Sequence, residues 1–407
     1  MELAARTARI AMSPTMKVTA DALKMKAQGI DVVDFGAGEP DFPTPPHVSA
    51  AAHKAIDANF TKYTTNSGTE DLKRAIVERH RLDNGVEYST AEVIVSAGGK
   101  QALFNTILSL FGPGDEVITH MPGWPTLVEQ IKLAEATPVI VRTHVENGFQ
   151  VTADLILGAV TPRTKGIIIN SPGNPTGALI SEADMEAIAK EAGKRGIWVI
   201  LDLCYDRLVY DAVPHNIIGI AAAHLRDRAV LCGSASKAYA MTGWRCGWVV
   251  GPKELIGACN AIQSHSTSNA CSISQRAAEA ALRGPQDCVT EMLDEYLRRR
   301  DQLHTWLSAD PRIRMVKPAG AFYMFPDVSE FLSPDGIRTS SELAAALLSE
   351  SHVAVTPGEA FDAPGFLRIS YATSMKDLER GSQRILEFLA KRSPAGAARH
   401  EQSPASA

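Results

Sequence analysis

Three short apolar runs of the sequence each lead into a group of polar residues. The runs are Gly166–Asn170, Ile197–Asp202 and Ala229–Gly233. The polar groups at or just beyond their ends supply an amide, a carboxylate, a phenol, a hydroxyl and an amine, from Asn174, Asp202, Tyr205, Ser234 and Lys237. Ligands of open α/β sheets bind outside the carboxyl ends of the strands. We therefore expect these side chains to converge on one site.

Lys237 is the side chain of this group best suited to covalent chemistry. It lies among small and apolar residues, which are unusual surroundings for a solvated lysine. Burial lowers the pKa of a lysine, and a neutral amine can form an imine or move a proton. These surroundings make Lys237 a candidate catalytic residue, whereas a lysine taken by itself is more often structural.

A fourth apolar run, Val93–Ser96, ends close to a pair of glycines. Gly98 and Gly99 precede Lys100 and a helical pattern. Glycines at the start of a helix let backbone N–H groups approach an anion, and the helix dipole favours negative charge. Since the same pair also fits a plain tight turn, it indicates an anion site only together with other residues.

The sequence around Lys237 resembles the lysine signature of the class I aminotransferases, which are fold-type I enzymes that use pyridoxal 5'-phosphate (PLP). The similar stretch is Ser234–Gly247. Other segments fall where the family has its remaining site residues: Ala37-Gly38-Glu-Pro-Asp-Phe, Lys62-Tyr63, Asn174-Pro-Thr-Gly177, Asp202-x-x-Tyr205 and Phe366-Leu-Arg368-Ile-Ser. The resemblance covers roughly residues 10 to 392 and is strongest to the bacterial-type aspartate aminotransferases.

Ala11-Met12 stands where the family usually has Lys-Pro, which leaves side-chain specificity open, and two positions nearer the cofactor site also depart from the pattern. Leu203-Cys204 stands where an acidic-apolar pair is usual, and Gly123 stands beside Trp124 where an aromatic residue is common. Neither departure removes a catalytic group.

The resemblance implies a role for each residue near the cofactor ring. Lys237 holds PLP as a Schiff base, and Asp202 keeps the pyridine nitrogen protonated, so that the ring remains an electron sink. Asn174 and Tyr205 hydrogen-bond the phenolic oxygen, and Trp124 stacks on the ring. The simpler alternatives are a turn cap for Asp202, an Asx-Pro turn for Asn174 and a core position for Trp124.

A phosphate site is also implied by the resemblance. Ser234 and Arg245 bind the phosphate together with the backbone amides of Gly99 and Lys100, because a guanidinium group donates two hydrogen bonds at once. The alternative for Arg245 is cation–π packing on a neighbouring tryptophan. Tyr63 resembles a residue that reaches the phosphate of the neighbouring subunit, so we expect a C2 homodimer with shared active sites.

The substrate-binding residues implied by the resemblance are Gly38, Arg368, Asn174, Trp124 and Thr15, and Lys100 is added because its position after the glycine pair lets it reach a second carboxylate. Arg368 grips the substrate α-carboxylate in the family, and a buried arginine should face an anion because an unpaired buried charge is costly. An internal salt bridge is its alternative role. Lys100 and Thr15 lie where side-chain specificity is decided, but Lys100 also fits a solvated lysine at a helix start.

Transamination is the reaction that the resemblance implies, and nothing in the motifs excludes another PLP reaction. The expected enzyme moves an amino group from an amino acid, with aspartate or glutamate preferred, to a 2-oxo acid by a ping-pong mechanism. Alternatives are an aromatic, neutral or prephenate aminotransferase, or a lyase, decarboxylase or oxidase on the same scaffold. A transcription regulator is the alternative from a non-enzyme class.

Alternating apolar and amphipathic segments predict how these residues are positioned. They indicate a three-layer α/β fold with a mainly parallel sheet in a large domain, followed by a smaller α+β domain. The resemblance implies that the large domain binds PLP. We expect the large domain at 46–309, the small domain with the N-terminal segment at 310–392 and 1–45, and a disordered tail at 393–407. Expected strands include Val93–Ser96, Glu116–Thr119, Gly166–Asn170, Ile197–Asp202, Ala229–Gly233, Gly247–Val250, Arg314–Val316, Ala321–Phe325, Val353–Val355 and Phe366–Tyr371. Expected helices include Gly99–Phe111, Glu182–Arg195, a long one over about 273–307, Ser340–Ser349 and Met375–Lys391.

The composition of the chain limits the kinds of partner that it is expected to bind. The chain has 407 residues, of which 45% are hydrophobic and 21% charged, and a formal net charge of -5. This mild charge gives no reason to expect a nucleic acid or a membrane as a partner. The six cysteines show no zinc-type or disulfide spacing, and the histidines form no cluster, so we predict a cytoplasmic protein without a metal.

Overall fold

The computed structural model describes residues 4–11, 14–211, 213 and 215–392, and of residues 5, 6 and 14–19 it describes the backbone alone. A seven-stranded sheet lies at the centre of this part of the chain, in the order β2-β8-β7-β6-β5-β3-β4. Its strands are β2 (Val93–Ser96), β3 (Glu116–Met121), β4 (Thr137–Arg142), β5 (Thr164–Asn170), β6 (Trp198–Asp202), β7 (Ala229–Ser234) and β8 (Gly247–Val250). Strand β8 is antiparallel to both neighbours, and the other pairings are parallel.

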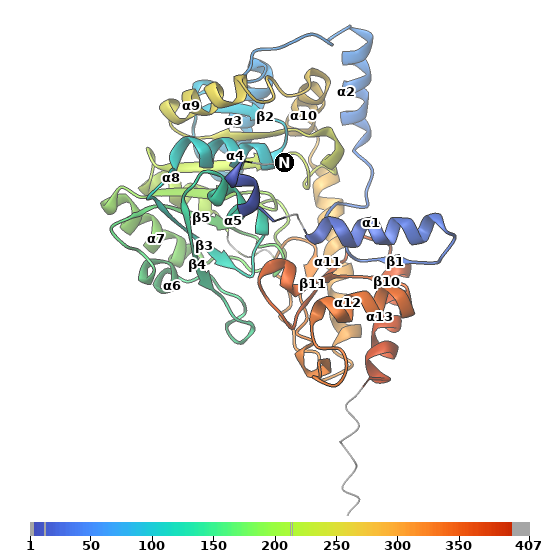
Figure 1. Ribbon diagram of the computed structural model, residues 1–407. Coiled ribbons are helices and arrows are strands. Elements are labelled where there is room, and N and C mark those ends of the chain that lie inside the picture. Colours follow the sequence, from blue (N-terminus) through green and yellow to red (C-terminus); the bar gives the residue numbers. More distant parts are fainter. Residues whose placement is uncertain (1–3, 12–13, 212, 214, 393–407) are drawn as a thin grey trace, which may run out of the picture.

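Helices cover both faces of this sheet (Figure 1). One buried core joins the sheet to α2 (Pro46–Asp57), α3 (Glu70–Asn84), α6 (Ala153–Gly158), α7 (Glu182–Arg195), α8 (Ile217–His224) and α10 (Ser272–Arg283). The core on the opposite face joins it to α4 (Gly99–Leu110), α5 (Pro125–Leu133) and α9 (Lys253–Ser264). Along β5, Ile167 and Ile169 enter the first core and Ile168 enters the second, because successive side chains of a strand point to opposite faces. The predicted three-layer α/β fold is confirmed.

Helix α7 shows how local sequence sets the ends of these elements. The Ser181 side chain caps its first turn by accepting a hydrogen bond from the Asp184 backbone N–H, and Gly196 ends it in the left-handed conformation. Acidic residues in its first turn and basic residues in its last turn oppose the helix dipole. The helix therefore has the bounds that its sequence predicts.

The C-terminal part has its own buried core and smaller sheets. Strands β11 (Thr356–Pro357), β12 (Leu367–Ser370) and β9 (Tyr323–Met324) form one antiparallel sheet, and β1 (Val33–Asp34) pairs in parallel with β10 (Val353–Ala354). The helices of this part are α1 (Pro14–Ala27), α11 (Asp287–Leu307), α12 (Ser340–Ser351) and α13 (Met375–Ala390). The pairing of β1 brings the N-terminal segment onto this part, as the predicted grouping requires.

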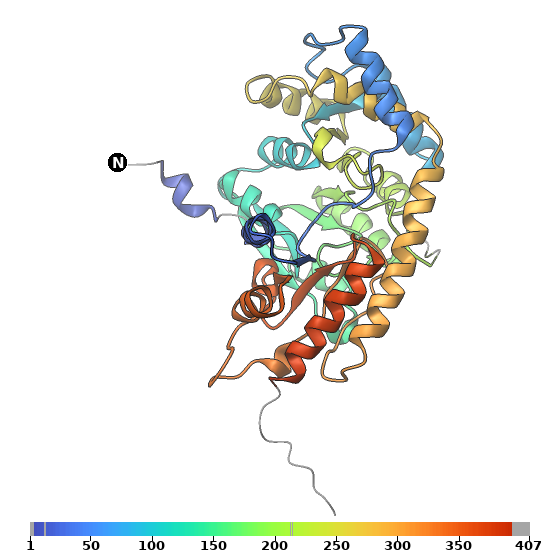
Figure 2. The ribbon, with the colours of Figure 1, turned by 90° about the vertical axis from the view of Figure 1, so that its right-hand side faces the viewer.

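Helix α11 joins the two parts. Figure 2 shows it running beside α13, and it buries Met292, Tyr296 and Leu303 in the C-terminal core. The sequence predicts this helix as part of the large domain, and the boundary at residue 309 stays a prediction. The predicted disordered tail, 393–407, lies outside the described residues.

The prediction of a single long helix over about 273–307 is wrong. The chain instead forms α10 and α11, with a break after Arg283. Gly284 is extended there, with φ -70° and ψ -178°. The next residue, Pro285, disfavours a helical conformation at Gly284 and lacks the N–H that a continued helix needs. The signal for the break was present in the sequence.

Two strand predictions also need correction. Of the expected strand Arg314–Val316, only Arg314 pairs, in an isolated bridge with Asp327. Strand β4 was not among the expected strands. It lies at the sheet edge, is only partly buried and has Pro138 as its second residue, so it lacks the continuous apolar run of the central strands.

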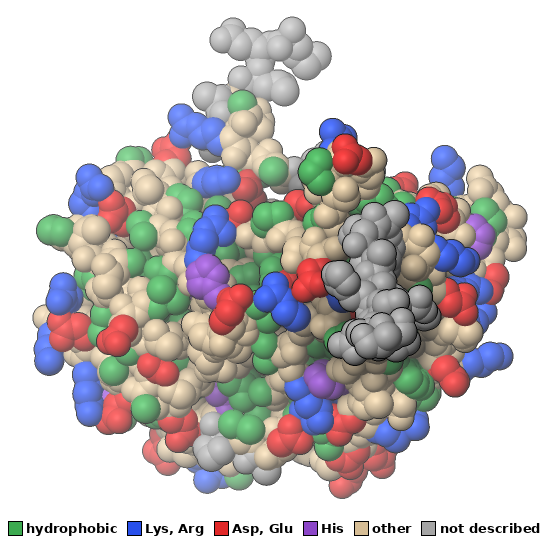
Figure 3. Space-filling view, turned by 90° about the horizontal axis from the view of Figure 1, so that it is seen from below, with side chains coloured by type: hydrophobic (Ala, Val, Ile, Leu, Met, Phe, Trp, Pro, Cys, Tyr) green, Lys and Arg blue, Asp and Glu red, His purple; other side chains and the backbone are tan. Residues whose placement is uncertain are grey.

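Short 3-10 helices lie in the connections. They are η1 (Ala5–Arg9), η2 (Thr90–Glu92), η3 (Val145–Asn147), η4 (Thr242–Trp244), η5 (Ser329–Phe331) and η6 (Gly358–Phe361). On the face drawn in Figure 3, basic and acidic side chains are interspersed. Within the described part of the chain, no helix has both the length and the apolar character needed to span a bilayer.

Candidate active site

The carboxyl ends of β5, β6 and β7 open into a cavity of about 500 Å³. Other walls come from the start of α4, the segment after β1, and strands β9 and β12. The predicted site residues that line it are Gly38, Gly99, Lys100, Trp124, Asn174, Asp202, Tyr205, Ser234, Lys237, Arg245 and Arg368. Asn174, Asp202, Tyr205, Ser234 and Lys237 therefore meet beyond the carboxyl ends of the strands, as predicted.

Lys237 projects into this cavity from the loop after β7. Its amine donates a hydrogen bond to the backbone carbonyl oxygen of Gly38. The amine lies 6.0 Å from the ring centroid of Tyr205 and 5.8 Å from that of Phe322. Burial holds the pKa of Lys237 below its usual value, so the neutral, nucleophilic amine is easier to reach than in a solvated lysine.

Asp202 is a buried carboxylate at the end of β6. One side-chain oxygen accepts a hydrogen bond from the Cys204 backbone N–H at 3.2 Å, and burial raises the pKa of Asp202 to about 7. Asn170 supports this region, because its side-chain nitrogen donates to the Asp202 carbonyl oxygen at 3.3 Å and its side-chain oxygen accepts from the Asn174 N–H at 3.0 Å. The Asp202 carboxylate is thus positioned but lacks a cationic partner among the described residues.

The start of α4 forms a cradle beneath Arg245. Gly98 has a φ of 89°, and a β-carbon there would lie 2.5 Å from Nη2 of Arg245. A β-carbon on Gly99 would lie 3.4 Å from that of Ser234. The first N–H groups of a helix have no intrahelical acceptor, so those of Gly99 and Lys100 can bind an anion beside the guanidinium. Within the described chain Arg245 makes no cation–π contact, so its alternative role is not realised.

Arg368 is an almost buried arginine on β12, with 3% of its surface exposed. Nη1 donates to the Asn174 side-chain oxygen at 3.1 Å, and Nη2 donates to the Gly36 carbonyl oxygen at 2.9 Å. Nε has no hydrogen-bond partner, and among the described residues no carboxylate pairs with this guanidinium. The internal salt bridge is therefore absent from the described chain, and the charge faces a cavity that can admit an anion.

Lys100 and Trp124 lie together on another wall. The Lys100 amine is 5.0 Å from the Trp124 ring centroid. Partial burial, together with the charge of Arg245, holds the pKa of Lys100 below its usual value. Its side chain remains largely accessible, so both a substrate contact and a solvated lysine fit this position.

Two predicted residues do not line the cavity. Tyr63 lies in the connection between α2 and α3 and is 91% exposed in this single chain. Thr15 lies in α1, and its side chain is outside the described part of the structure.

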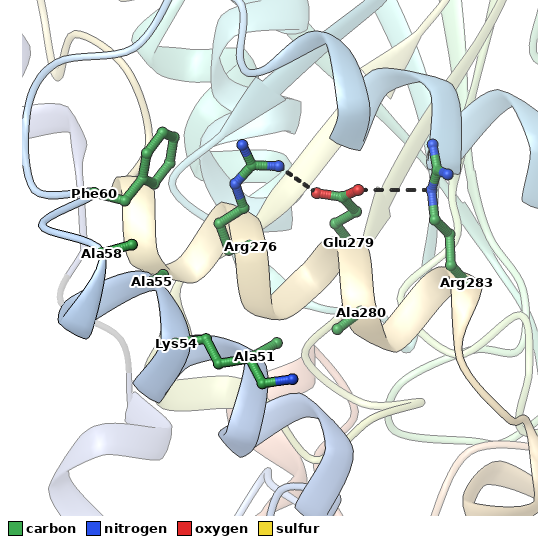
Figure 4. Close-up of a pocket in the computed structure, with 9 residues that line it drawn as sticks. All are labelled: Ala51, Lys54, Ala55, Ala58, Phe60, Arg276, Glu279, Ala280 and Arg283. Atoms are coloured by element: carbon green, nitrogen blue, oxygen red, sulfur yellow. Dashed lines mark hydrogen bonds and ion pairs between the residues drawn. The ribbon is translucent and has the colours of Figure 1, made fainter.

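A second hollow lies between α2 and α10 (Figure 4). Its floor is built from alanines and Phe60. Arg276 pairs with Glu279 and Asp71, at 2.9 and 3.0 Å, and Arg283 lies 3.7 Å from Glu279. Because these charges largely neutralise one another and no buried nucleophile faces the hollow, the catalytic chemistry belongs to the cavity around Lys237.

Comparison with known proteins agrees with this geometry. Residues 30–385 match the family described as aminotransferase class I and II. The chain belongs to this family. An aspartate aminotransferase of Bacillus sp. (strain YM-2) is 42% identical over 95% of this chain and 99% of its own length. An aspartate/prephenate aminotransferase of Cereibacter sphaeroides is 43% identical over 94% of this chain and 97% of its own length.

Solved structures give the same result. The aspartate aminotransferase of Rhizobium meliloti has a TM-score of 0.90 at 40% identity, covering 96% of this chain and 99% of that one. The Thermus thermophilus aspartate aminotransferase with maleate has a TM-score of 0.89 at 38% identity, covering 95% of this chain and 99% of that one. The protein is thus an aminotransferase, and the predicted family, fold and enzyme class are confirmed.

Several lining residues of this aminotransferase were not predicted as site residues. They are Gly36, Ala37, Glu39, Asn170, Cys204, Ser236, Thr242 and Tyr323. The departure at Leu203-Cys204 now has a structural account, because Leu203 is buried in the core and Cys204 faces the cavity. Tyr323 gave no signal in the sequence, because it comes from a different sheet.

Proposed function

We propose that this aminotransferase binds PLP through Lys237 and transfers the amino group of aspartate or glutamate to a 2-oxo acid. The observation that carries the proposal is the convergence of three groups on one cavity. These are the Lys237 amine, the Asp202 carboxylate without a cationic partner, and the buried, unpaired Arg368 guanidinium. Known class I aminotransferases use PLP, and this set supports the same cofactor here.

The chemistry of the lining residues fits each part of PLP. Asp202 would accept a hydrogen bond from the protonated ring nitrogen, which supplies the cationic partner that its buried carboxylate lacks. The cradle at the start of α4, with Ser234 and Arg245, would hold the phosphate. Asn174 and Tyr205 would hydrogen-bond the phenolic oxygen, and Trp124 would stack on the ring.

Substrate binding and proton transfer follow from the remaining groups. When bound, PLP supplies a conjugated ring that accepts the electron pair left as the substrate α-proton departs. Arg368 binds the substrate α-carboxylate and so fixes the direction of the α-carbon. Lys237 Nζ takes the α-proton as a general base and returns it as a general acid. Because donor and acceptor use the same site in turn, ping-pong kinetics are expected.

Lys100 supports a substrate with a second carboxylate. Its amine lies on the cavity wall beside Trp124, within reach of a side chain that extends from the α-carbon. The relatives described above include both an aspartate and an aspartate/prephenate aminotransferase. Prephenate also carries two carboxylates and is therefore a second candidate acceptor. Thr15 remains a proposed contact from the N-terminal side.

We also propose that two copies of the chain share their active sites. Tyr63 is 91% exposed and does not line the cavity of its own chain, which suits a residue that contacts the phosphate of a neighbouring subunit.

Single-turnover absorbance spectra with a panel of amino donors test the proposal. Aspartate and glutamate should convert the bound cofactor to its amine form faster than alanine or leucine. In Lys100→Ala this preference should fall about 10- to 100-fold, the equivalent of one charged hydrogen bond of ~1.5–3 kcal/mol. Rates with neutral donors should not change, and they serve as the internal control. Release of ammonia or CO₂ from one amino acid alone would instead indicate a lyase, oxidase or decarboxylase.

A further inference from the structure

Tyr323 on β9 is a buried cavity residue with no role in the scheme above. Its hydroxyl lies 2.8 Å from the Tyr205 hydroxyl, and its ring lies 4.4 Å from the Arg368 guanidinium carbon. A β-carbon on Gly38 would come within 3.4 Å of the Tyr323 hydroxyl. Tyr323 therefore contacts a residue assigned to the cofactor and a residue assigned to the substrate.

The two hydroxyl groups share one hydrogen bond but carry two protons. Within the described chain, neither Tyr205 nor Tyr323 has another hydrogen-bond partner for its hydroxyl. If Tyr205 donates, its proton is used inside the pair. If Tyr323 donates, the Tyr205 proton is free to point into the cavity. Burial raises the pKa of both tyrosines, so both keep their protons and one of these two arrangements must be present.

A ligand oxygen beside Tyr205 selects the second arrangement. An acceptor in the cavity can receive a hydrogen bond from the Tyr205 hydroxyl only when Tyr205 itself accepts a hydrogen bond from Tyr323. A chain of two hydrogen bonds then forms, and each bond polarises and strengthens the next. The ring of Tyr323 has a separate role, since it packs against the guanidinium of Arg368 whether or not the hydroxyl is present.

We propose that Tyr323 is a positioning residue whose hydroxyl donates to Tyr205 and thereby directs the Tyr205 proton onto the phenolic oxygen of the bound cofactor. This inference rests on the proposed function, which places that oxygen beside Tyr205. The hydroxyl acts through Tyr205 and has no direct contact with the substrate in this scheme.

Tyr323→Phe tests the hydroxyl while keeping the ring over Arg368. The control is Tyr371→Phe, because Tyr371 is equally buried but its hydroxyl contacts Tyr210 and the Ala321 carbonyl oxygen and does not line the cavity. Each variant is compared with the wild type as the cofactor-loaded protein. The first readout is the pH midpoint of the visible absorbance change, and the second is the affinity for maleate, a dicarboxylate probe.

The midpoint should rise in Tyr323→Phe by about 0.4–1 pH unit, which corresponds to losing a hydrogen bond of ~0.5–1.5 kcal/mol. The reason is that a weaker donor leaves more negative charge on the ring oxygen, and this charge favours the protonated form of the nearby Lys237 nitrogen. Maleate affinity should stay within about twofold, because the ring and Arg368 are kept.

An unchanged midpoint in Tyr323→Phe would overturn the inference, and so would an equal shift in Tyr371→Phe. A loss of maleate affinity in Tyr323→Phe would also overturn it, because the hydroxyl would then act on Arg368. If the proposed function were wrong, the wild-type protein itself would show no visible absorbance from a cofactor bound to Lys237. The two failures can therefore be distinguished.

Discussion

Because Asp202 is buried, the protonation of its carboxyl group depends on what fills the cavity. In the unfolded chain this group ionises near its usual pKa of about 4. In the folded, cofactor-free chain it keeps its proton up to a pKa of about 7. Between these values the folded state binds more protons than the unfolded state, so the free energy of unfolding falls as the pH rises.

The Asp202→Asn variant should lose this pH dependence. Between about pH 5 and about pH 8, we expect the cofactor-free wild type to lose about 2–3 kcal/mol more stability than the variant. Urea unfolding at both pH values measures the difference. The comparison removes the contribution of Asp206, whose pKa burial also raises, to about 6. Parallel pH profiles for the two proteins would show that Asp202 is ionised in the empty cavity.

A second prediction for a single residue concerns Lys237. Lys237→Ala should fold normally but lose multiple turnover and the visible absorbance of covalently held cofactor, because no other amine occupies its place in the loop after β7. Lys165→Ala removes an exposed lysine from β5 and is the matched control. Normal transaminase turnover in Lys237→Ala would refute the assignment.

At the scale of the element, the start of α4 combines a helix N-terminus with a glycine that cannot be replaced without moving Arg245. Gly98→Ala should weaken PLP binding by about 10- to 100-fold, because the added carbon displaces a guanidinium worth ~1.5–3 kcal/mol in charged hydrogen bonds. Equilibrium titration of the cofactor-free protein with PLP measures this loss.

Gly114→Ala is the control for backbone strain. Gly114 has a φ of 92°, close to that of Gly98, but a β-carbon there would meet nothing within 4 Å. This variant should lose about 1 kcal/mol of stability and keep its PLP affinity. Equal losses of affinity in the two variants would mean that strain, and not the position of Arg245, controls binding.

At the scale of the whole molecule, Tyr63 and Lys237 are proposed to serve one site from two chains. Mixing Tyr63→Ala with Lys237→Ala and allowing subunit exchange should restore about one quarter of wild-type activity, since half of the dimers then contain one intact site. Activity is followed during exchange, with Leu82→Ala in place of Tyr63→Ala as an exposed-residue control. No gain after demonstrated exchange would place Tyr63 within its own chain or outside the site.

Much of the fold and most of the site could be read from local patterns. Glu182–Arg195 was predicted with its observed bounds because capping residues and charges mark both ends of α7. The strand ends located Asp202 and Lys237 because polar residues directly follow buried runs. The break after Arg283 was missed although Pro285 signals it, and Tyr323 was missed because nothing near it in sequence relates β9 to the end of β6.

Local sequence patterns were sufficient to establish the family, the layered α/β fold and the groups that meet at the strand ends. These follow from patterns within a few residues, such as apolar runs, caps and the stretch around Lys237. The tertiary structure decided which charges are left without partners. Among the described residues, Arg368 has no carboxylate partner, Asp202 has no cationic partner, and the Tyr205 hydroxyl is hydrogen-bonded to that of Tyr323. These properties depend on burial and on contacts between segments far apart in the chain, because the cost of an unpaired polar group is set by everything that surrounds it in space.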